Sequence, residues 1–209
     1  MSKSMEFSRT VRCRASVICC LLLMSTILVG CGQSYAFAGT PFVPVLDAPE
    51  VAGVMRDGKD FALSDLSQKV KLVFFGYTSC PDICPLTLSN LKSVYEQLTD
   101  TQRSDVAVVL ISVDPQRDTP ERLAAYTEAF NPTFFGVHIP EDRLAQLLDD
   151  FNVFSGKRSL SGAADDENYL MDHTAVIFVV DGENKLREIF PSNAPADQIA
   201  ADVRYLLSE

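Results

Sequence analysis

The chain has 209 residues, of which 47% are apolar and 22% are charged, the ordinary composition of a globular protein with room for one domain. This composition excludes a disordered or fibrous protein. Its 28 acidic residues outnumber the 18 Lys and Arg, and the net charge of -10 provides no positive field that would attract nucleic acid. We therefore expect no nucleic-acid partner.

The first 30 residues differ from this average and have the pattern of a signal peptide. Residues 1–16 are basic, and the 13 residues at 17–29 contain no charged side chain. A helix needs about 17 to 25 apolar residues to cross a bilayer, which is longer than this stretch. The pattern therefore favours a cleaved signal over a permanent transmembrane span.

The apolar stretch ends in Leu28-Val29-Gly30-Cys31, which resembles the lipobox of bacterial lipoproteins. In such a signal the cysteine thiol is acylated before cleavage, and Cys31 would become a lipidated N-terminus. The alternative is cleavage near Ala36 or Ala38, which would discard Cys31. We predict a lipid anchor at Cys31 that holds the protein on a bacterial cell membrane, with its domain facing the periplasm or the outer surface.

Removal of the signal at residues 1–30 changes the charge and the cysteine content of the chain. It takes away four of the 18 basic residues and one of the 28 acidic ones, which leaves 14 against 27, a net charge of -13. With Cys31 acylated, only Cys80 and Cys84 remain as thiols. In an oxidising compartment, two thiols this close in sequence either form a disulfide or hold a metal.

Residues 31–48 contain Gly, Ser and Pro without apolar periodicity, so we expect an anchor and spacer there and a single domain over residues 49–209. The domain opens with a predicted hairpin that turns at Asp57-Gly58. In chain order, the next elements predicted are a buried strand at 70–77, a helix after the cysteines through residue 98, a buried strand at 106–113 and a helix at 120–130.

The second half of the domain continues this alternation. In chain order, it predicts a short strand at 133–137, a helix at 140–151, a polar loop at 155–168, a strand pair at 174–180 and 185–190, and a closing helix at 195–207. Strands that alternate with helices favour a parallel core, to which the last strand pair adds antiparallel strands. The predicted class is α/β, a three-layer α/β/α sandwich with a mixed sheet and an N-terminal hairpin.

Cys80 and Cys84 stand where the strand at 70–77 runs into a helix, the end of a strand at which sites lie in such sheets. Free N–H groups at a helix N-terminus favour thiolate over thiol, which makes sulfur a better nucleophile and a better soft-metal ligand. Positions i and i+4 share one helix face, so both sulfurs could bind one ion, and their separation also permits a disulfide. Packing as two small buried side chains is the alternative, and the polar Asp82 between the cysteines argues against it.

Two histidines, His138 and His173, could complete a metal site. His173 lies directly before the strand at 174–180 and could reach the cysteines if that strand neighbours the one at 70–77. His138 lies in a strand-to-helix connection, where exposed loop polarity explains it. Met171 shares a strand face with His173, and core packing explains its thioether better than copper binding does. Two thiolates and an imidazole suit Cu(I) first, then Cu(II), then Zn(II).

Three longer motifs contain these residues. They are Phe75-Gly76-Tyr77-Thr78-x-Cys80-Pro81-x-x-Cys84-Pro85, Ser112-Val113-Asp114-Pro115-x-Arg117-Asp118-Thr119-Pro120, and Tyr169-x-x-Asp172-His173-Thr174. Together they resemble the Sco (SenC) family of copper-binding proteins, from about residue 45 to the C-terminus. The resemblance implies a thioredoxin-like fold, copper ligands at Cys80, Cys84 and His173, and a role for Asp114 beside the ligands or in contact with a partner. The lipobox departs from the uncleaved transmembrane anchor common in this family, and Thr174 stands where Ser is frequent.

The resemblance predicts a membrane-tethered copper chaperone that serves assembly of the binuclear copper site of cytochrome c oxidase. Its cargo would be one copper ion, as Cu(I), Cu(II) or both, and its partners the copper-site subunit of the oxidase and other periplasmic copper carriers. The rival prediction is a thiol-disulfide oxidoreductase that reduces the cysteines of the oxidase copper site, or a peroxidase-like dithiol enzyme. Such enzymes carry a proline before the strand that faces the cysteines, whereas Asp172-His173-Thr174 occupies that place here.

Overall fold

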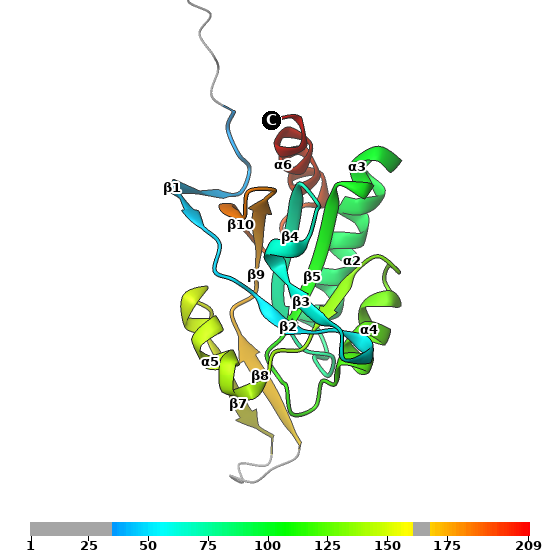
Figure 1. Cartoon of the computed structure of the whole chain (residues 1–209), viewed down its shortest axis with the longest axis vertical. Coiled ribbons are helices and arrows are strands. Elements are labelled where there is room, and N and C mark those ends of the chain that lie inside the picture. The colour runs from blue at the N-terminus through cyan, green and yellow to red at the C-terminus, as the bar shows by residue number, and fades with distance from the viewer. Residues whose placement is uncertain (1–34, 161–167) are drawn as a thin grey trace, which may run out of the picture. The chain divides into compact units, whose positions relative to one another are not determined.

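The apolar runs of the chain form the centre of a six-stranded mixed sheet in the computed structural model, which describes residues 35–160 and 168–209 (Figure 1). The strand order is β1-β10-β9-β4-β5-β6. In chain order these strands are β1 (Thr40–Asp47), β4 (Val70–Gly76), β5 (Val106–Ser112), β6 (Phe135–Val137), β9 (Val176–Asp181) and β10 (Lys185–Pro191). The strands β4, β5 and β6 run parallel, while β9, β10 and β1 are each antiparallel to their neighbours. The predicted mixed α/β sheet is confirmed.

Helices cover both faces of this sheet, because successive side chains of its buried strands point to opposite sides. On β4, Leu72 and Phe74 belong to the cluster that includes residues of α2 (Ile83–Glu96), α4 (Pro120–Glu128) and α6 (Ala196–Ser208). The alternate residues Val73 and Phe75 belong to the cluster that includes residues of α5 (Glu141–Asp150) and of the β2–β3 hairpin. The remaining elements are β2 (Ala52–Val54), η1 (Arg56–Gly58), β3 (Asp60–Ala62), η2 (Leu63–Asp65), α3 (Asp100–Ser104), β7 (Ser155–Ser159) and β8 (Tyr169–His173).

The hairpin predicted at Asp57-Gly58 is present as the β2–β3 pair. Asp57 and Gly58 both have positive φ angles, of 64° and 68°, a conformation that Gly and Asp adopt more readily than other residues. The hairpin also reaches the edge of the main sheet, since Val54 and His138 exchange backbone hydrogen bonds of 2.8 and 3.0 Å.

Part of the expected spacer at residues 31–48 is a strand instead. Thr40–Asp47 forms β1 and pairs antiparallel with β10 at the edge of the main sheet. An edge strand with almost every side chain exposed has no alternating apolar pattern, and Pro41 and Pro44 are tolerated where only one side of a strand is paired. The sequence pattern therefore could not distinguish this strand from a linker, and the compact unit of the fold begins earlier, at Phe37.

The polar loop expected at residues 155–168 also contains a strand. Ser155–Ser159 (β7) pairs antiparallel with Tyr169–His173 (β8) in a separate two-stranded sheet, with Ser155 opposite His173. No residue of β7 is fully buried, so its sequence lacks the apolar pattern by which a strand can be predicted. Pairing with β8 alone makes it a strand, and this pairing holds the segment that carries His173.

Two carboxyl groups meet between the sheet and α6. Glu188 on β10 is fully buried, and Asp202 on α6 accepts hydrogen bonds from the backbone N–H groups of Ala38 (2.7 Å) and Gly39 (3.2 Å). Burial, and then hydrogen bonding and repulsion with Asp202, raises the pKa of Glu188 to about 8. The carboxyl pair therefore fastens the start of the domain to its last helix.

Glu188→Gln is expected to become progressively more stable than the wild type as the pH rises from about 4.5 to about 8. Over this window the unfolded chain loses a proton that folded Glu188 keeps, so the stability of the wild type falls with rising pH. At about 1.4 kcal/mol per pKa unit, the difference approaches roughly 5 kcal/mol. Urea unfolding at a series of pH values measures it, with the exposed Glu183→Gln as control, and an unchanged difference between pH 5 and 8 would contradict the prediction.

Candidate metal centre

The topology of the sheet brings Cys80, Cys84 and His173 together. Cys80 follows the carboxyl end of β4, and β9 is antiparallel to β4 with Ile177 opposite Phe74. Residues that follow β4 therefore lie beside residues that precede β9. His173 is one of the residues that precede β9. The possible ligand atoms of the three residues, two Sγ atoms and one imidazole nitrogen, all lie within 4.8 Å of one another.

The two cysteines are not on one helix face as expected, because α2 begins only at Ile83. Cys80 lies in the preceding turn, where its N–H donates to the carbonyl of Tyr77 (3.3 Å), and its side chain is half-buried. Cys84 lies in the first helical turn, is 1% exposed, and donates its backbone N–H to the Cys80 sulfur at 3.5 Å. The turn folds back on the helix N-terminus, so the sulfurs approach each other without both cysteines being helical.

The two sulfurs have opposite acidities. The pKa of Cys80 is lowered to about 3, chiefly because the Cys84 thiol donates to its thiolate, with the backbone N–H groups of Asp82 and Cys84 adding further hydrogen bonds. The same hydrogen bond and burial raise the pKa of Cys84. Without a metal, the pair therefore holds one negative charge, on the more exposed sulfur.

His173 presents its Nε2 atom to the sulfurs. Nε2 lies 3.5 Å from the Cys84 Sγ, while Nδ1 lies 3.2 Å from the carbonyl oxygen of Thr174. Because a carbonyl only accepts, Nδ1 carries the proton in this contact, and Nε2 keeps a lone pair for a ligand. The buried Tyr77 packs edge-on against the imidazole, with ring centroids 6.0 Å apart, and its hydroxyl accepts the N–H of Met171. Tyr77 thus orients the imidazole, a role that the sequence analysis missed.

Asp114 lies outside the ligand cluster. It is 1% exposed, pairs with Arg117, and accepts a hydrogen bond of 2.7 Å from the Tyr169 hydroxyl. Arg117 also donates to the Tyr169 carbonyl at 2.9 Å. A partner contact does not fit this burial. Asp114 instead ties the loop after β5 to the start of β8, the strand that ends at His173.

A family model described as SCO1/SenC matches residues 52–208. The chain belongs to the SCO1/SenC family. The match includes Cys80, Cys84 and His173, so this is a Sco protein with a Cys-x3-Cys/His cluster.

Relatives and solved structures are consistent with this membership. A SCO2-like protein of Rickettsia felis is 30% identical over 191 residues, covering 85% of this chain and 92% of the relative. The solution structure of apo Sco1 from Thermus thermophilus is 35% identical and has a TM-score of 0.74, covering 84% of this chain and 99% of that one. The structure of Bradyrhizobium japonicum ScoI with copper bound is 29% identical with a TM-score of 0.67, covering 77% of this chain and 99% of that one. This Sco protein therefore has the thioredoxin-like fold of its family, and copper is the metal that the comparison supports.

Gly76 of this Sco protein explains how Cys84 comes so close to the end of β4. A Cβ atom at Gly76 would lie 2.8 Å from the Cys84 sulfur, closer than real Cβ atoms come to another heavy atom, and a tight 3.1 Å from the Leu110 side chain. Position 76 needs glycine because the Cys84 sulfur occupies the space that a side chain at residue 76 would fill. The sequence offered only the motif context as a signal for this residue.

Gly76→Ala is expected to push Cys84 away from His173 and to weaken copper binding by about tenfold, the lower range for disturbed support of a metal site. A copper titration of the reduced variant measures the effect. Gly182→Ala is the matched control, because a Cβ there meets its nearest atom at an ordinary 3.4 Å. Equal affinities for Gly76→Ala and the wild type would show that Cys84 does not need this position.

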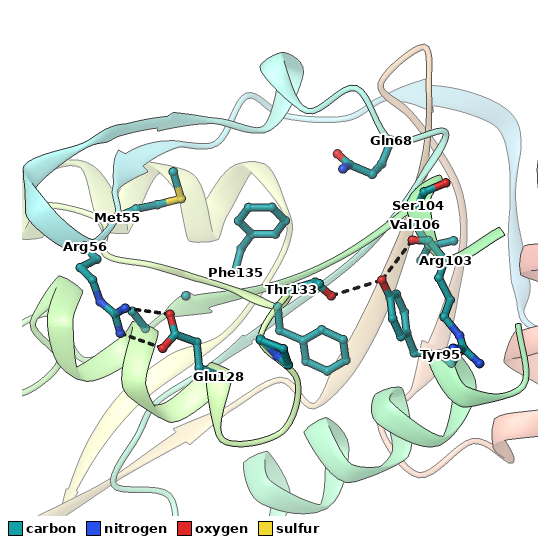
Figure 2. A pocket seen from close by; sticks show the side chains of 14 residues that line it. Met55, Arg56, Gln68, Tyr95, Arg103, Ser104, Val106, Glu128, Thr133 and Phe135 are labelled. Carbon is teal, nitrogen blue, oxygen red and sulfur yellow. Dashed lines mark hydrogen bonds and ion pairs between the residues drawn. The ribbon is translucent and has the colours of Figure 1, made fainter. Parts of the chain in front are cut away.

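His138 and Met171, the other candidates from the sequence, have partners of their own. His138 is half-buried rather than exposed, and its Nδ1 donates to the Asp118 carbonyl at 2.8 Å. Met171 packs against the core as expected. A pocket of about 370 Å³ lies elsewhere, bounded by the Arg56–Glu128 ion pair and by Tyr95 (Figure 2). None of the three cluster residues lines this pocket, so its position does not define the site.

Cys31 lies outside the described residues. Within residues 35–160 and 168–209, no helix combines the length and the apolar character that crossing a membrane requires.

Proposed function

We propose that this Sco protein is a membrane-tethered copper chaperone that binds one copper ion through Cys80, Cys84 and His173. Its acceptor would be the binuclear copper site of cytochrome c oxidase. The observation that carries the proposal is the cluster of two sulfurs and one imidazole nitrogen within 4.8 Å, in a family with a copper-bound relative. The role in oxidase assembly comes from the family.

The donor set fits copper better than the other common metals. Two thiolates favour soft ions such as Cu(I), and the added imidazole nitrogen suits Cu(II) and Zn(II) as well. The oxygen-rich sites that Mg²⁺ or Ca²⁺ require are not built at this cluster. The half-exposed Cys80 is open to an incoming group, whereas Cys84 is buried and held in place.

Delivery would proceed by ligand exchange. An acceptor thiolate enters from the side of Cys80 and forms a new bond to the ion as the bond to His173 or to one sulfur breaks. The copper keeps ligands throughout and is never free in solution. Other periplasmic copper carriers could load the site by the reverse exchange.

The test is a titration of the reduced protein with Cu(I), Cu(II) and Zn(II) separately, followed by transfer to the metal-free copper-site subunit of the oxidase. We expect one tightly bound copper per chain, weaker Zn(II) binding, and movement of the copper to the subunit. Zn(II) binding as tight as copper binding, or an unloaded subunit after mixing, would count against a chaperone.

A second candidate function is thiol-disulfide exchange with the cysteines of the oxidase copper site. The lowered pKa of Cys80, beside a second thiol, favours it because a thiolate is the attacking group in such exchange. Against it, His173 and Thr174 stand before β9, where oxidoreductases of this fold carry a proline. The rate of thiol-disulfide exchange in wild type and in His173→Ala separates the two functions. An exchange enzyme needs no metal, so the substitution should change its exchange rate without a copper-specific effect, whereas in a chaperone it should weaken copper binding.

We propose further that the tether is a lipid on Cys31. Cys31→Ser is expected to abolish the labelling of the protein by fatty acid and to leave the signal uncleaved at that site. Cys20→Ser, inside the same apolar stretch, is the control and should keep the label. Several acyl chains make such attachment stable, whereas a single chain binds membranes weakly. Labelled Cys31→Ser protein would refute the anchor.

A further inference from the structure

Asp118 is a buried carboxylate directly beneath the Cys80 turn. It is 0% exposed and lies in the loop between β5 and α4, at the same edge of the sheet as the end of β4. Its oxygens accept hydrogen bonds from the backbone N–H of Thr78 (3.0 Å), from the Thr78 hydroxyl, and from the Ser112 hydroxyl (2.7 Å). In the part of the chain that the structure describes, no basic side chain forms an ion pair with it.

These bonds act on the turn that carries the first sulfur. Thr78 lies two residues before Cys80, and one carboxylate holds both its backbone and its side chain. A second bond reaches the turn from α4, where Arg122 donates to the Ser79 hydroxyl at 3.0 Å. The turn that carries Cys80 is thus held from the loop after β5 and from α4, in addition to the bond that the Cys84 N–H of α2 donates to the sulfur.

The energetics favour Asp118 as the main support. Hydrogen bonds to a buried charge are shorter and about twice as strong as neutral ones. The bond from Arg122 lies at the exposed surface, where water competes for both partners. Loss of the Thr78 hydroxyl would leave Asp118 with one acceptor position unfilled in a buried setting, and the turn would relax toward solvent.

We propose that Asp118, acting through Thr78, is a positioning residue that holds Cys80 in place for copper binding. The inference rests on the proposed copper site and adds to it a residue that does not touch the metal. The carboxylate is linked to the Cys80 turn by the two bonds of Thr78, and Ser112 holds its other side against β5.

The test compares Thr78→Val with Thr78→Ser in the full-length protein, using Cu(I) and Cu(II) as the probes. Valine keeps the size of threonine but removes the hydroxyl, whereas serine keeps the hydroxyl and removes a methyl group. We expect Thr78→Val to weaken the binding of both ions by about tenfold and to shift the thiolate-to-Cu(II) absorption band. Thr78→Ser should restore both the affinity and the band.

Thr127→Val is the matched control. Thr127 is also buried, and its hydroxyl bonds to the carbonyls of Leu123 (3.1 Å) and Phe134 (3.3 Å), in α4 and just before β6. The same loss of a buried hydroxyl should lower the unfolding midpoint there and leave the copper band unchanged. A copper band that shifts in Thr127→Val as much as in Thr78→Val would overturn the inference, because general destabilisation would then explain both.

Asp118→Asn tests the carboxylate itself. An amide oxygen can still accept the Thr78 N–H, and the two hydroxyls can turn to accept from the amide NH₂, so weaker neutral bonds replace the charged ones. We expect a loss of affinity smaller than that of Thr78→Val, and wild-type affinity in both variants would overturn the inference. If Asp118→Asn does not fold, the comparison of Thr78→Val with Thr78→Ser tests the inference by itself. A wild type that binds no copper contradicts the proposed function instead, which keeps the two failures distinct.

Discussion

His173→Ala is expected to weaken Cu(II) binding by at least about 100-fold, because loss of even a residue that only supports a ligand costs up to about that much, and to weaken Cu(I) binding far less. Cu(I) accepts two thiolates alone, whereas Cu(II) prefers a more nearly square arrangement with nitrogen or oxygen donors beside sulfur. Nε2 of His173, 3.5 Å from the Cys84 sulfur, is the nitrogen placed to complete that arrangement. The thiolate-to-Cu(II) absorption band should also shift or bleach.

The measurement is a titration of the reduced variant with each ion, together with the absorption spectrum of the Cu(II) form. His138→Ala is the matched control, because it removes the other imidazole, whose Nδ1 donates to the backbone carbonyl of Asp118. The ratio of Cu(II) to Cu(I) affinity should stay at the wild-type value in this control. If that ratio is also unchanged in His173→Ala, His173 is not a ligand.

Oxidation of Cys80 and Cys84 to a disulfide is expected to eliminate copper binding. A disulfide occupies both sulfurs at a separation of about 2.0 Å and leaves neither as a thiolate. The reduced protein should show two titratable thiols if Cys31 is acylated, and the oxidised protein none. A disulfide form that still binds one copper tightly would remove both sulfurs from the ligand set.

The two thiols should also differ in reactivity before any copper is added. With its pKa lowered to about 3, Cys80 is a thiolate over the whole accessible pH range above 4, so its alkylation rate should be flat there. An ordinary thiol, with a pKa near 9, loses about tenfold in rate per pH unit below it. Mass analysis after brief alkylation at pH 6 should find the label on Cys80, and a label on the buried Cys84 would contradict the assignment.

The predictions of the buried strands and of the candidate ligand residues depended on burial and on residue chemistry, which are local properties of the sequence. The runs that became β4 and β5 are fully buried on both faces, and only a central strand explains seven such residues in succession. Cys80 and Cys84 stood out because thiols are rare after the signal peptide, and their position at the end of β4 follows from local chain direction. His173 could be placed because the sequence pattern puts it just before a core strand, and in the structure it ends β8, shortly before β9 begins at Val176.

The sequence by itself therefore determined the layers of the fold, the central strands and the chemistry of the donor set. Burial produces apolar runs, and donor chemistry depends on residue type, so both can be recognised in the sequence without knowledge of distant contacts. The tertiary structure alone decided that β9 lies antiparallel beside β4, which brings His173 to the cysteines. It also decided that β1 and β7 are strands, since exposed edge residues pair through their backbones and no side-chain pattern records the pairing. The same reason separates Asp114 from Asp118: both are buried acids in one loop, and only their partners, Arg117 and Tyr169 for one and Thr78 and Ser112 for the other, assign them different roles.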